Sequence, residues 1–274
     1  MSRVLEIIRD SVLDVRRRLA AAYCITPESL KDNESMRACK GLGKRRVLKY
    51  TSAHIPKSGD PEEYYRRFLA PYIKRAINTK VTIAPPKDMM SRSGDSIHDM
   101  MFWTKPSEIK IVNNISNAYA NRYGTKKGFR KYIKFVLYHE FGHALDYALN
   151  IAWRTSTSTG AFTRDVKSIS AGGAKADPYF DISTEYGRRE VFAEWSALQD
   201  LLGGALGLGD IENLCYIKKK YPKRDRIKIK AERGYEITQL DYVMQSTLIQ
   251  SFLNCDDHKD TLKRLNSMGL KAET

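Results

Sequence analysis

Hydrophobic positions in residues 1–23 recur at helical spacing. The segment reads MSRVLEIIRDSVLDVRRRLAAAY, and its apolar positions are Val4, Leu5, Ile8, Val12, Val15 and Leu19. This spacing predicts an amphipathic helix packed on the body of the protein, with a helix on a membrane surface as the alternative. Charges recur every few residues, so the segment lacks the continuous apolar core of a secretion signal. No apolar run in the chain reaches the length that crosses a bilayer.

Four shorter segments follow with strand-like or helical patterns. RVLKYTSAHI, residues 46–55, has the β-branched and aromatic content of a strand. Residues 61–78 space their apolar side chains as in a helix, which Pro71 kinks or splits. KVTIAPP at 80–86 predicts a short strand ended by prolines. EIKIVNN at 108–114 predicts a strand charged enough to lie at a sheet edge.

Two longer helices are predicted in the second half of the chain. Apolar residues from 127 to 150 cover much of the helix circumference, which predicts a central, buried helix. They are Phe129, Ile133, Val136, Leu137, Phe141, Ala144 and Ala148. Residues 151–183 are rich in Ser, Thr, Gly and Ala and predict mostly loop. A second helix is predicted from Thr184 to Leu202, ended by the Gly-Gly pair that follows.

The order of these elements, strands first and helices afterwards, predicts an α+β fold. In it the buried helix lies across a small mixed sheet. QLDYVMQSTLIQSFLN and HKDTLKRLNSM make the C-terminal third helical in pattern. We divide the chain into an N-terminal helical/β extension, 1–60, and a main domain, 61–274. The main domain has a strand-containing part, 61–150, and a helical part, 151–274.

The composition is that of an ordinary globular protein, with one exception. The 274 residues are 42% hydrophobic and 29% charged, which suits a chain with a sizeable core. The cysteines form no C-x-x-C pair, which predicts free thiols in a reducing compartment: Cys24, Cys39, Cys215 and Cys255. The exception is the net charge of +15. It favours acidic partners, whether nucleic acid, an acidic protein surface or anionic lipid.

Positive charge is concentrated in residues 216–236, YIKKKYPKRDRIKIKAERGYE. The nine basic residues there are Lys218, Lys219, Lys220, Lys223, Arg224, Arg226, Lys228, Lys230 and Arg233. GKRRVLK at 43–49 adds four more. Such a run is commonly a solvated face. The alternatives are binding of an acidic protein substrate and non-specific contact of Lys218–Arg233 with nucleic-acid phosphates. No zinc-finger, P-loop or RNA-recognition signature indicates sequence-specific reading.

The strongest chemical signal is HEFGH within the predicted central helix. His139 and His143 stand four residues apart, so both imidazoles share one helix face and can ligate one Zn²⁺. Glu140 then lies beside the metal, where it can take a proton from the attacking water, as in H-E-x-x-H zinc proteases. Two satisfied core histidines are the alternative. Burying these groups without partners costs several kcal/mol, and Gly142 weakens the helix by about 1 kcal/mol relative to Ala. The motif therefore predicts a metal site.

A catalytic zinc needs a third protein ligand. A third histidine on the same motif is excluded, because Asp146 and Leu149 occupy the positions concerned. The second helix offers two carboxylates, Glu190 and Glu194, at i and i+4. The first can complete the site while the other accepts a hydrogen bond from a ligand histidine; solvated surface carboxylates are the alternative. Asp146 follows His143 by three residues and predicts either a contact that orients His143 or a salt bridge near the helix end.

HEFGHALDY followed by YGRREVFAE resembles the anthrax lethal factor-like zinc metallopeptidases, which include the Pro-Pro endopeptidases. The resemblance extends at most from about residue 105 to 205. It implies a zincin-like fold and a set of site residues: His139, His143 and Glu190 as Zn²⁺ ligands, Glu140 as general base, Tyr186 as a donor to the oxyanion or leaving group, and Glu194 as the second acidic position.

The chain departs from the family pattern at two points. Val191 stands where the family has Phe, and the interval from Tyr186 to Glu190 is a few residues shorter. Tyr186 therefore keeps its role only if the helix already includes it. Zincins of this kind bind substrate as a strand added to a sheet edge, which makes residues 108–114 the expected edge. An ordinary edge strand without a ligand is the alternative.

Two functions from different classes are compatible with these patterns. The first is a zinc endopeptidase acting on a protein or peptide, acidic in charge, in the cytoplasm or after delivery or packaging without a cleavable signal peptide, as a toxin-like effector or virion protein. The second is a cationic structural or binding protein on a zincin scaffold, associated with nucleic acid or a virion-like particle. Glu140 favours the first, because a structural zinc site needs its ligands but no base.

Overall fold

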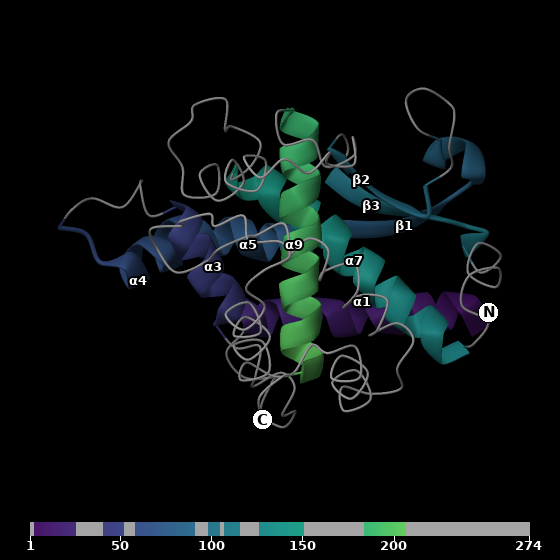
Figure 1. Cartoon of the computed structure of the whole chain (residues 1–274), viewed down its shortest axis with the longest axis horizontal. Coiled ribbons are helices and arrows are strands. Elements are labelled where there is room, and N and C mark those ends of the chain that lie inside the picture. Colours follow the sequence, from purple (N-terminus) through teal and green to yellow (C-terminus); the bar gives the residue numbers. More distant parts are fainter. Residues whose placement is uncertain are drawn as a thin grey trace, which may run out of the picture.

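The computed structural model describes residues 3–25, 41–51, 58–90, 98–104, 107–115, 126–150 and 184–206 (Figure 1). In chain order its elements are α1 (Arg3–Ala22), α3 (Leu42–Thr51), α4 (Pro61–Tyr64), the π-helical turn η2 (Tyr65–Leu69), α5 (Ala70–Ile77), β1 (Lys80–Ala84), the 3₁₀ turn η3 (Pro86–Met89), β2 (Met100–Thr104), β3 (Ser107–Val112), α7 (Lys126–Leu149) and α9 (Glu185–Leu206). The described elements combine helices with one three-stranded sheet, so the α+β prediction is confirmed for the described residues.

Helix α1 is the amphipathic helix that the hydrophobic spacing predicts. Ile8, Val12, Val15 and Leu19 are buried, and the helix packs against α7. An ion pair of 2.7 Å between Asp14 and the Lys134 amine joins the two helices at their margin. The helix therefore lies on the protein body, as predicted. None of the described helices is long and apolar enough to span a membrane.

The strand predicted at 46–55 is wrong for its described part, because residues up to Thr51 belong to helix α3. Val47 and Tyr50 are three residues apart and both buried, which is helical rather than alternating spacing. Gly43 lets the helix approach α1, since a Cβ there would stand 2.7 Å from the Tyr23 ring. Packing against α1 therefore overrides the β preference of the β-branched and aromatic residues.

The helix predicted at 61–78 is present, and its α-helical hydrogen bonding is interrupted just before Pro71. Helices α4 and α5 are joined by the π-helical turn η2, in which the Ala70 N–H donates to the Tyr65 carbonyl five residues earlier. Pro71 has no N–H and cannot bond to the carbonyl four residues before it. The helix continues by changing its hydrogen-bond register instead of breaking.

The sheet order is β1-β3-β2, with β1 parallel and β2 antiparallel to β3. The strand predicted at 80–86 is β1. The strand predicted at 108–114 is β3, but it lies in the centre, so its edge placement is wrong. Its charges are tolerated there because the buried Glu108 lies 3.6 Å from the Lys110 amine and 3.3 Å from the Thr82 hydroxyl. Among the described strands, β2 lies at an edge of the sheet. No strand was predicted there, because the sequence MMFWT lacks the polar alternation that marks a strand.

Helix α7 is central and buried, as predicted, and contacts α1, α5, α9 and the sheet. Helix α9 starts where predicted, since the Thr184 hydroxyl accepts a hydrogen bond of 2.9 Å from the Gly187 N–H. Its predicted end is wrong, because α9 continues through Gly203 and Gly204. Glycine lowers helix propensity by about 1 kcal/mol without blocking the backbone bonds of an established helix.

Several predictions fall outside the described residues. These are the loop at 151–183, the C-terminal helices and the basic stretch 216–236. The division at residue 60 stays a prediction; α1 and α3 contribute Leu19 and Val47 to the same hydrophobic core as α7.

Candidate metal centre

The centre is built where α9 crosses α7 at close range (Figure 1). Gly142 in α7 faces Ala193 in α9, and a Cβ on Gly142 would stand 2.9 Å from the Ala193 Cα and 3.0 Å from its carbonyl oxygen. Only glycine permits this approach. The cost of Gly142 to helix stability thus has a packing reason. The two helices must come close for their side chains to share a metal.

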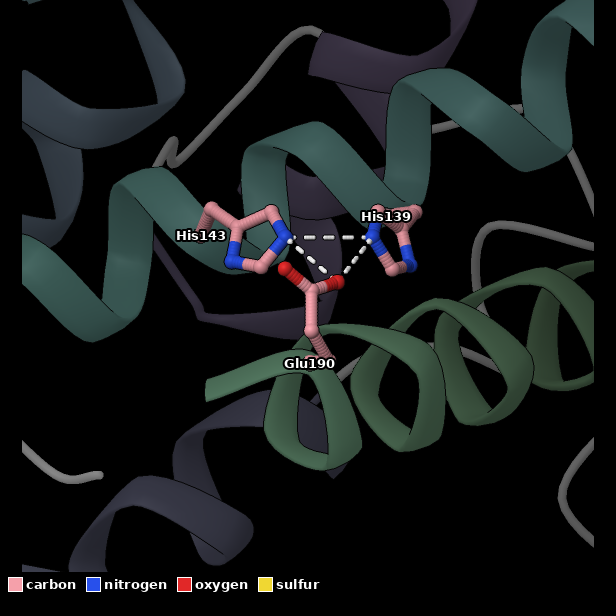
Figure 2. Close-up of side chains that lie close together, drawn as sticks. All are labelled: His139, His143 and Glu190. Carbon is pink, nitrogen blue, oxygen red and sulfur yellow. Dashed lines mark hydrogen bonds and ion pairs between the residues drawn. The ribbon is translucent and has the colours of Figure 1, made fainter. Parts of the chain in front are cut away.

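Three side chains converge across this crossing (Figure 2). His139 and His143 project from α7, and Glu190 projects from α9 toward both imidazoles. The two histidine Nε2 atoms are 3.1 Å apart, and the Glu190 Oε2 atom lies 3.2 Å from each. All three residues are buried. The structure thus brings together the three predicted ligands and can hold a metal ion between them.

The spacing of the three atoms fits metal coordination. Ligand atoms about 2.0–2.1 Å from a tetrahedral zinc ion stand about 3.3 Å from one another. The observed separations of 3.1 and 3.2 Å are close to that value. A single proton can bridge two of these atoms, whereas a metal ion contacts all three. The geometry therefore indicates a cation site with two nitrogen ligands and one oxygen ligand.

Glu140 is buried next to this cluster. Its carboxylate accepts a hydrogen bond from the backbone N–H of Phe102 in β2. Burial raises the pKa of Glu140, although His139 and His143 partly oppose the rise. A carboxylate with a raised pKa is a better proton acceptor than one in water, which is the property that the predicted general base needs.

Glu190 behaves in the opposite way. Burial by itself raises the pKa of Glu190, but His143 and His139 outweigh it and hold the pKa well below its usual range. The carboxylate is therefore ionised when it faces the histidines. Two neighbouring carboxylates thus have different properties: one is suited to hold a cation and the other to exchange a proton.

The outer nitrogen of His143 does not contact Asp146, its predicted partner. The Nδ1 atom of His143 is buried and has no hydrogen-bond partner within the described part of the chain. Asp146 is fully buried, and its carboxylate lies 3.7 Å from the Arg189 guanidinium of α9. Of the two roles predicted for Asp146, the structure shows the salt bridge and not the contact that orients His143.

Tyr186 lies in the first turn of α9, four residues before Glu190, so the helix already includes it. Because α9 already includes Tyr186, the short interval between Tyr186 and Glu190 leaves the two side chains on one face of the helix. The Tyr186 side chain is half exposed. Glu194 belongs to the same helix, but its side chain is outside the described residues, so its second acidic role stays a prediction.

Sequence reasoning missed the contribution of the sheet. Phe102 supplies the N–H that holds Glu140, and its ring lies 6.0 Å from the ring of Tyr147 in α7. Tyr147 follows His143 by four residues and is partly exposed. Because Tyr147 follows His143 by four residues, the sequence indicates that both lie on one face of the helix. The contact between Tyr147 and Phe102 of β2 depends on the fold and could not be predicted from the sequence.

Comparison with protein-family models, curated proteins and solved structures found no match to this chain.

Proposed function

We propose that this chain is a zinc-dependent endopeptidase with a zincin-like fold, similar to the lethal factor-like metallopeptidases. The observation that carries the proposal is the buried cluster of His139, His143 and Glu190, with Glu140 beside it. A structural metal site needs only the three ligands. The buried carboxylate next to them, with its raised pKa, supports a site that performs proton transfer.

Zinc is the metal that the donor set favours. Two imidazole nitrogens and one carboxylate oxygen form the ligand set of catalytic zinc sites that keep one position open. Magnesium and calcium prefer oxygen ligands alone, and no thiolate takes part here. Zinc supplies a lowered pKa for water and polarisation of a carbonyl oxygen when bound.

The chain's own residues would supply the remaining chemistry. Glu140 takes a proton from the attacking water and returns it to the leaving amine. The Phe102 N–H keeps the Glu140 carboxylate in place while it does so. Tyr186 donates a hydrogen bond to the oxyanion that develops on the scissile carbonyl.

The substrate would add to β2, which replaces the segment 108–114 as the expected edge. Among the described strands β2 ends the sheet order β1-β3-β2, and it packs against α7, the helix that carries His139 and His143. An extended peptide can pair with such an edge through its backbone. The scissile bond would then lie next to the zinc ligands of α7.

The test is metal content with matched variants. Plasma mass spectrometry should find about one zinc per chain in the wild type, in line with a single three-ligand site. His143→Ala and Glu190→Ala should lose zinc, whereas Glu140→Gln should retain it. On a peptide library, Glu140→Gln should lower cleavage by a factor of about 10²–10⁴, and Tyr186→Phe should lower it less.

Zinc-free protein after incubation with zinc would overturn the proposal. A zinc-loaded wild type that cleaves no more than Glu140→Gln would do the same. Either result would favour the second function, a cationic binding protein on the same scaffold.

A further inference from the structure

A row of large side chains lies on the helix formed by α4, η2 and α5 (left in Figure 1). One side of this helix is buried in the core through Tyr65, Leu69, Ile73 and Ile77. The neighbouring side carries large residues, which are exposed except for the partly buried Tyr64. We call it the arginine–aromatic face and define it as Tyr64, Arg67, Phe68, Tyr72 and Arg75.

Two of the three rings of this face are exposed to an unusual degree. Phe68 is 53% exposed and Tyr72 is 46% exposed. The Tyr64 ring contacts Phe68 with centroids 5.5 Å apart. Phe68 and Tyr72 are one helical turn apart, so the rings form a row along the helix. Stability alone gives no reason to expose two adjacent aromatic rings, and such patches commonly mark binding sites.

Each exposed ring is paired with a guanidinium group. Arg67 lies over the Phe68 ring at 5.6 Å from its centroid, and Arg75 lies over the Tyr72 ring at 5.1 Å. Each exposed ring therefore has a planar cation beside it. A surface that combines aromatic rings with guanidinium groups can stack against a planar ligand and attract negative charge at the same time.

The surroundings of the face are basic. Arg66, Lys74 and Lys80 are exposed on the same helix or directly after it. Of the nearby acidic residues, Glu63 pairs with Arg67 at 3.1 Å, Glu62 pairs with Lys44, and Asp60 accepts a hydrogen bond from the Glu62 N–H at the start of α4. The chain as a whole carries a net charge of +15. The ligand is therefore expected to be a polyanion with planar groups.

We propose that the arginine–aromatic face binds single-stranded nucleic acid without sequence preference. Bases stack on the Phe68 and Tyr72 rings and on the guanidinium planes, while the flanking cations contact phosphates. An acidic peptide matches the charge but leaves the rings unused. The face includes no residue of the basic stretch 216–236, and the proposal does not depend on the proposed peptidase activity.

The test uses the full-length, zinc-treated protein and a fluorescein-labelled oligothymidine of about 20 nucleotides, longer than the usual site of one such surface. Fluorescence anisotropy gives the affinity between about 50 and 200 mM salt. Phe68→Ala/Tyr72→Ala removes both rings without changing charge. Arg67→Gln/Arg75→Gln removes two charges. Arg9→Gln/Arg17→Gln, on the exposed side of α1, is the matched charge control.

Removal of the rings should weaken binding about tenfold or more and leave the salt dependence unchanged. Removal of Arg67 and Arg75 should also weaken binding and lower the slope of log affinity against log salt by about 1.4. The α1 control should stay near the wild type. Unchanged thermal unfolding would show that each variant is folded.

Three outcomes would overturn the proposal. The first is no binding of the oligonucleotide at low salt. The second is binding that the ring-free variant retains in full, which would assign it to charge elsewhere in the chain. The third is tighter, ring-dependent binding to polyglutamate or to phosphatidylserine vesicles, which would identify an acidic protein or a membrane as the partner.

Discussion

Helix α9 carries two buried polar clusters that differ in one chemical respect. Near its C-terminal part, Asp200 meets Arg46 of α3. The Arg46 guanidinium donates hydrogen bonds of 2.9 and 3.1 Å to the Asp200 carboxylate and another to the hydroxyl of Tyr23, which directly follows α1. Near its N-terminal part, Glu190 meets His139 and His143. The first cluster pairs donors with acceptors, while the second brings together atoms that all have lone pairs to offer.

The difference distinguishes a structural ion pair from a ligand site. In the Arg46 cluster a buried cation of the protein already faces the buried carboxylate, so no added group is needed to compensate the charge. In the Glu190 cluster the carboxylate and the imidazole nitrogens are complementary to a cation that the protein itself does not supply. Burial alone therefore does not identify a functional site, whereas the balance of donors and acceptors does.

The largest expected effect comes from breaking the structural pair. Asp200→Ala should lower the free energy of unfolding by about 3–5 kcal/mol, because it leaves a buried guanidinium without its counter-charge. Urea denaturation measures the change. The paired replacement Arg46→Met/Asp200→Leu should restore most of the loss, since an apolar pair requires no charge compensation. A loss of stability below about 1 kcal/mol in Asp200→Ala is what a surface ion pair gives, and it would contradict the structural role assigned to the Arg46–Asp200 pair.

Zinc should stabilise the second cluster and not the first. Free zinc at about a hundred times its dissociation constant should raise the free energy of unfolding by about 2.7 kcal/mol, because only the folded chain presents the three ligands. Chelation should reverse the gain. In Glu190→Ala the gain should be absent, while Asp200→Ala should keep it. Equal stabilisation of Glu190→Ala and the wild type would show that zinc binds elsewhere.

A smaller effect is expected from separating the two helices. Gly142→Ala places a methyl group against the Ala193 backbone, and overpacking of this kind costs about 1–3 kcal/mol. The better helix propensity of alanine offsets about 1 kcal/mol of this cost. Zinc affinity, measured by competition with a chelating dye, should fall more clearly than stability, because α9 carries Glu190. Ala193→Gly in the same chain should not restore affinity, since the blocked atoms belong to the backbone.

The smallest effect concerns the α1–α7 contact. Burial raises the pKa of Asp14, but Lys134 and Arg18 outweigh it and hold the pKa below 3.8. The carboxylate thus stabilises the fold above about pH 4, and the contribution disappears as the pH falls through the lowered pKa. Asp14→Asn should cost about 1 kcal/mol or less at pH 7 and nothing at the lowest pH at which the protein stays folded. An equal loss at both pH values would contradict this reason.

Much of the fold followed from local patterns, and the errors have a common origin. The helical spacing of α1 and α7 was readable because each helix repeats its pattern over several turns. The short segments at α3 and β3 were misassigned in type or position. At α3, packing against α1 overrides the β preference of the β-branched and aromatic residues. At β3, the charges suggested a sheet edge, although Glu108 is buried beside Lys110 of the same strand and Thr82 of β1. Neither the neighbour of a helix nor the order of strands in a sheet can be read from a local pattern.

The candidate site divides in the same way. The two histidines, the adjacent Glu140 and a second helix with carboxylates could be predicted from the sequence alone, because residues four apart on a helix share a face. The crossing of α9 and α7 at Gly142, the contact of Glu190 with both histidines and the hydrogen bond from the Phe102 N–H to Glu140 follow only from the fold. The physical reason is one of range: helix periodicity is a local property of the backbone, whereas the approach of two helices depends on packing between residues distant in the chain.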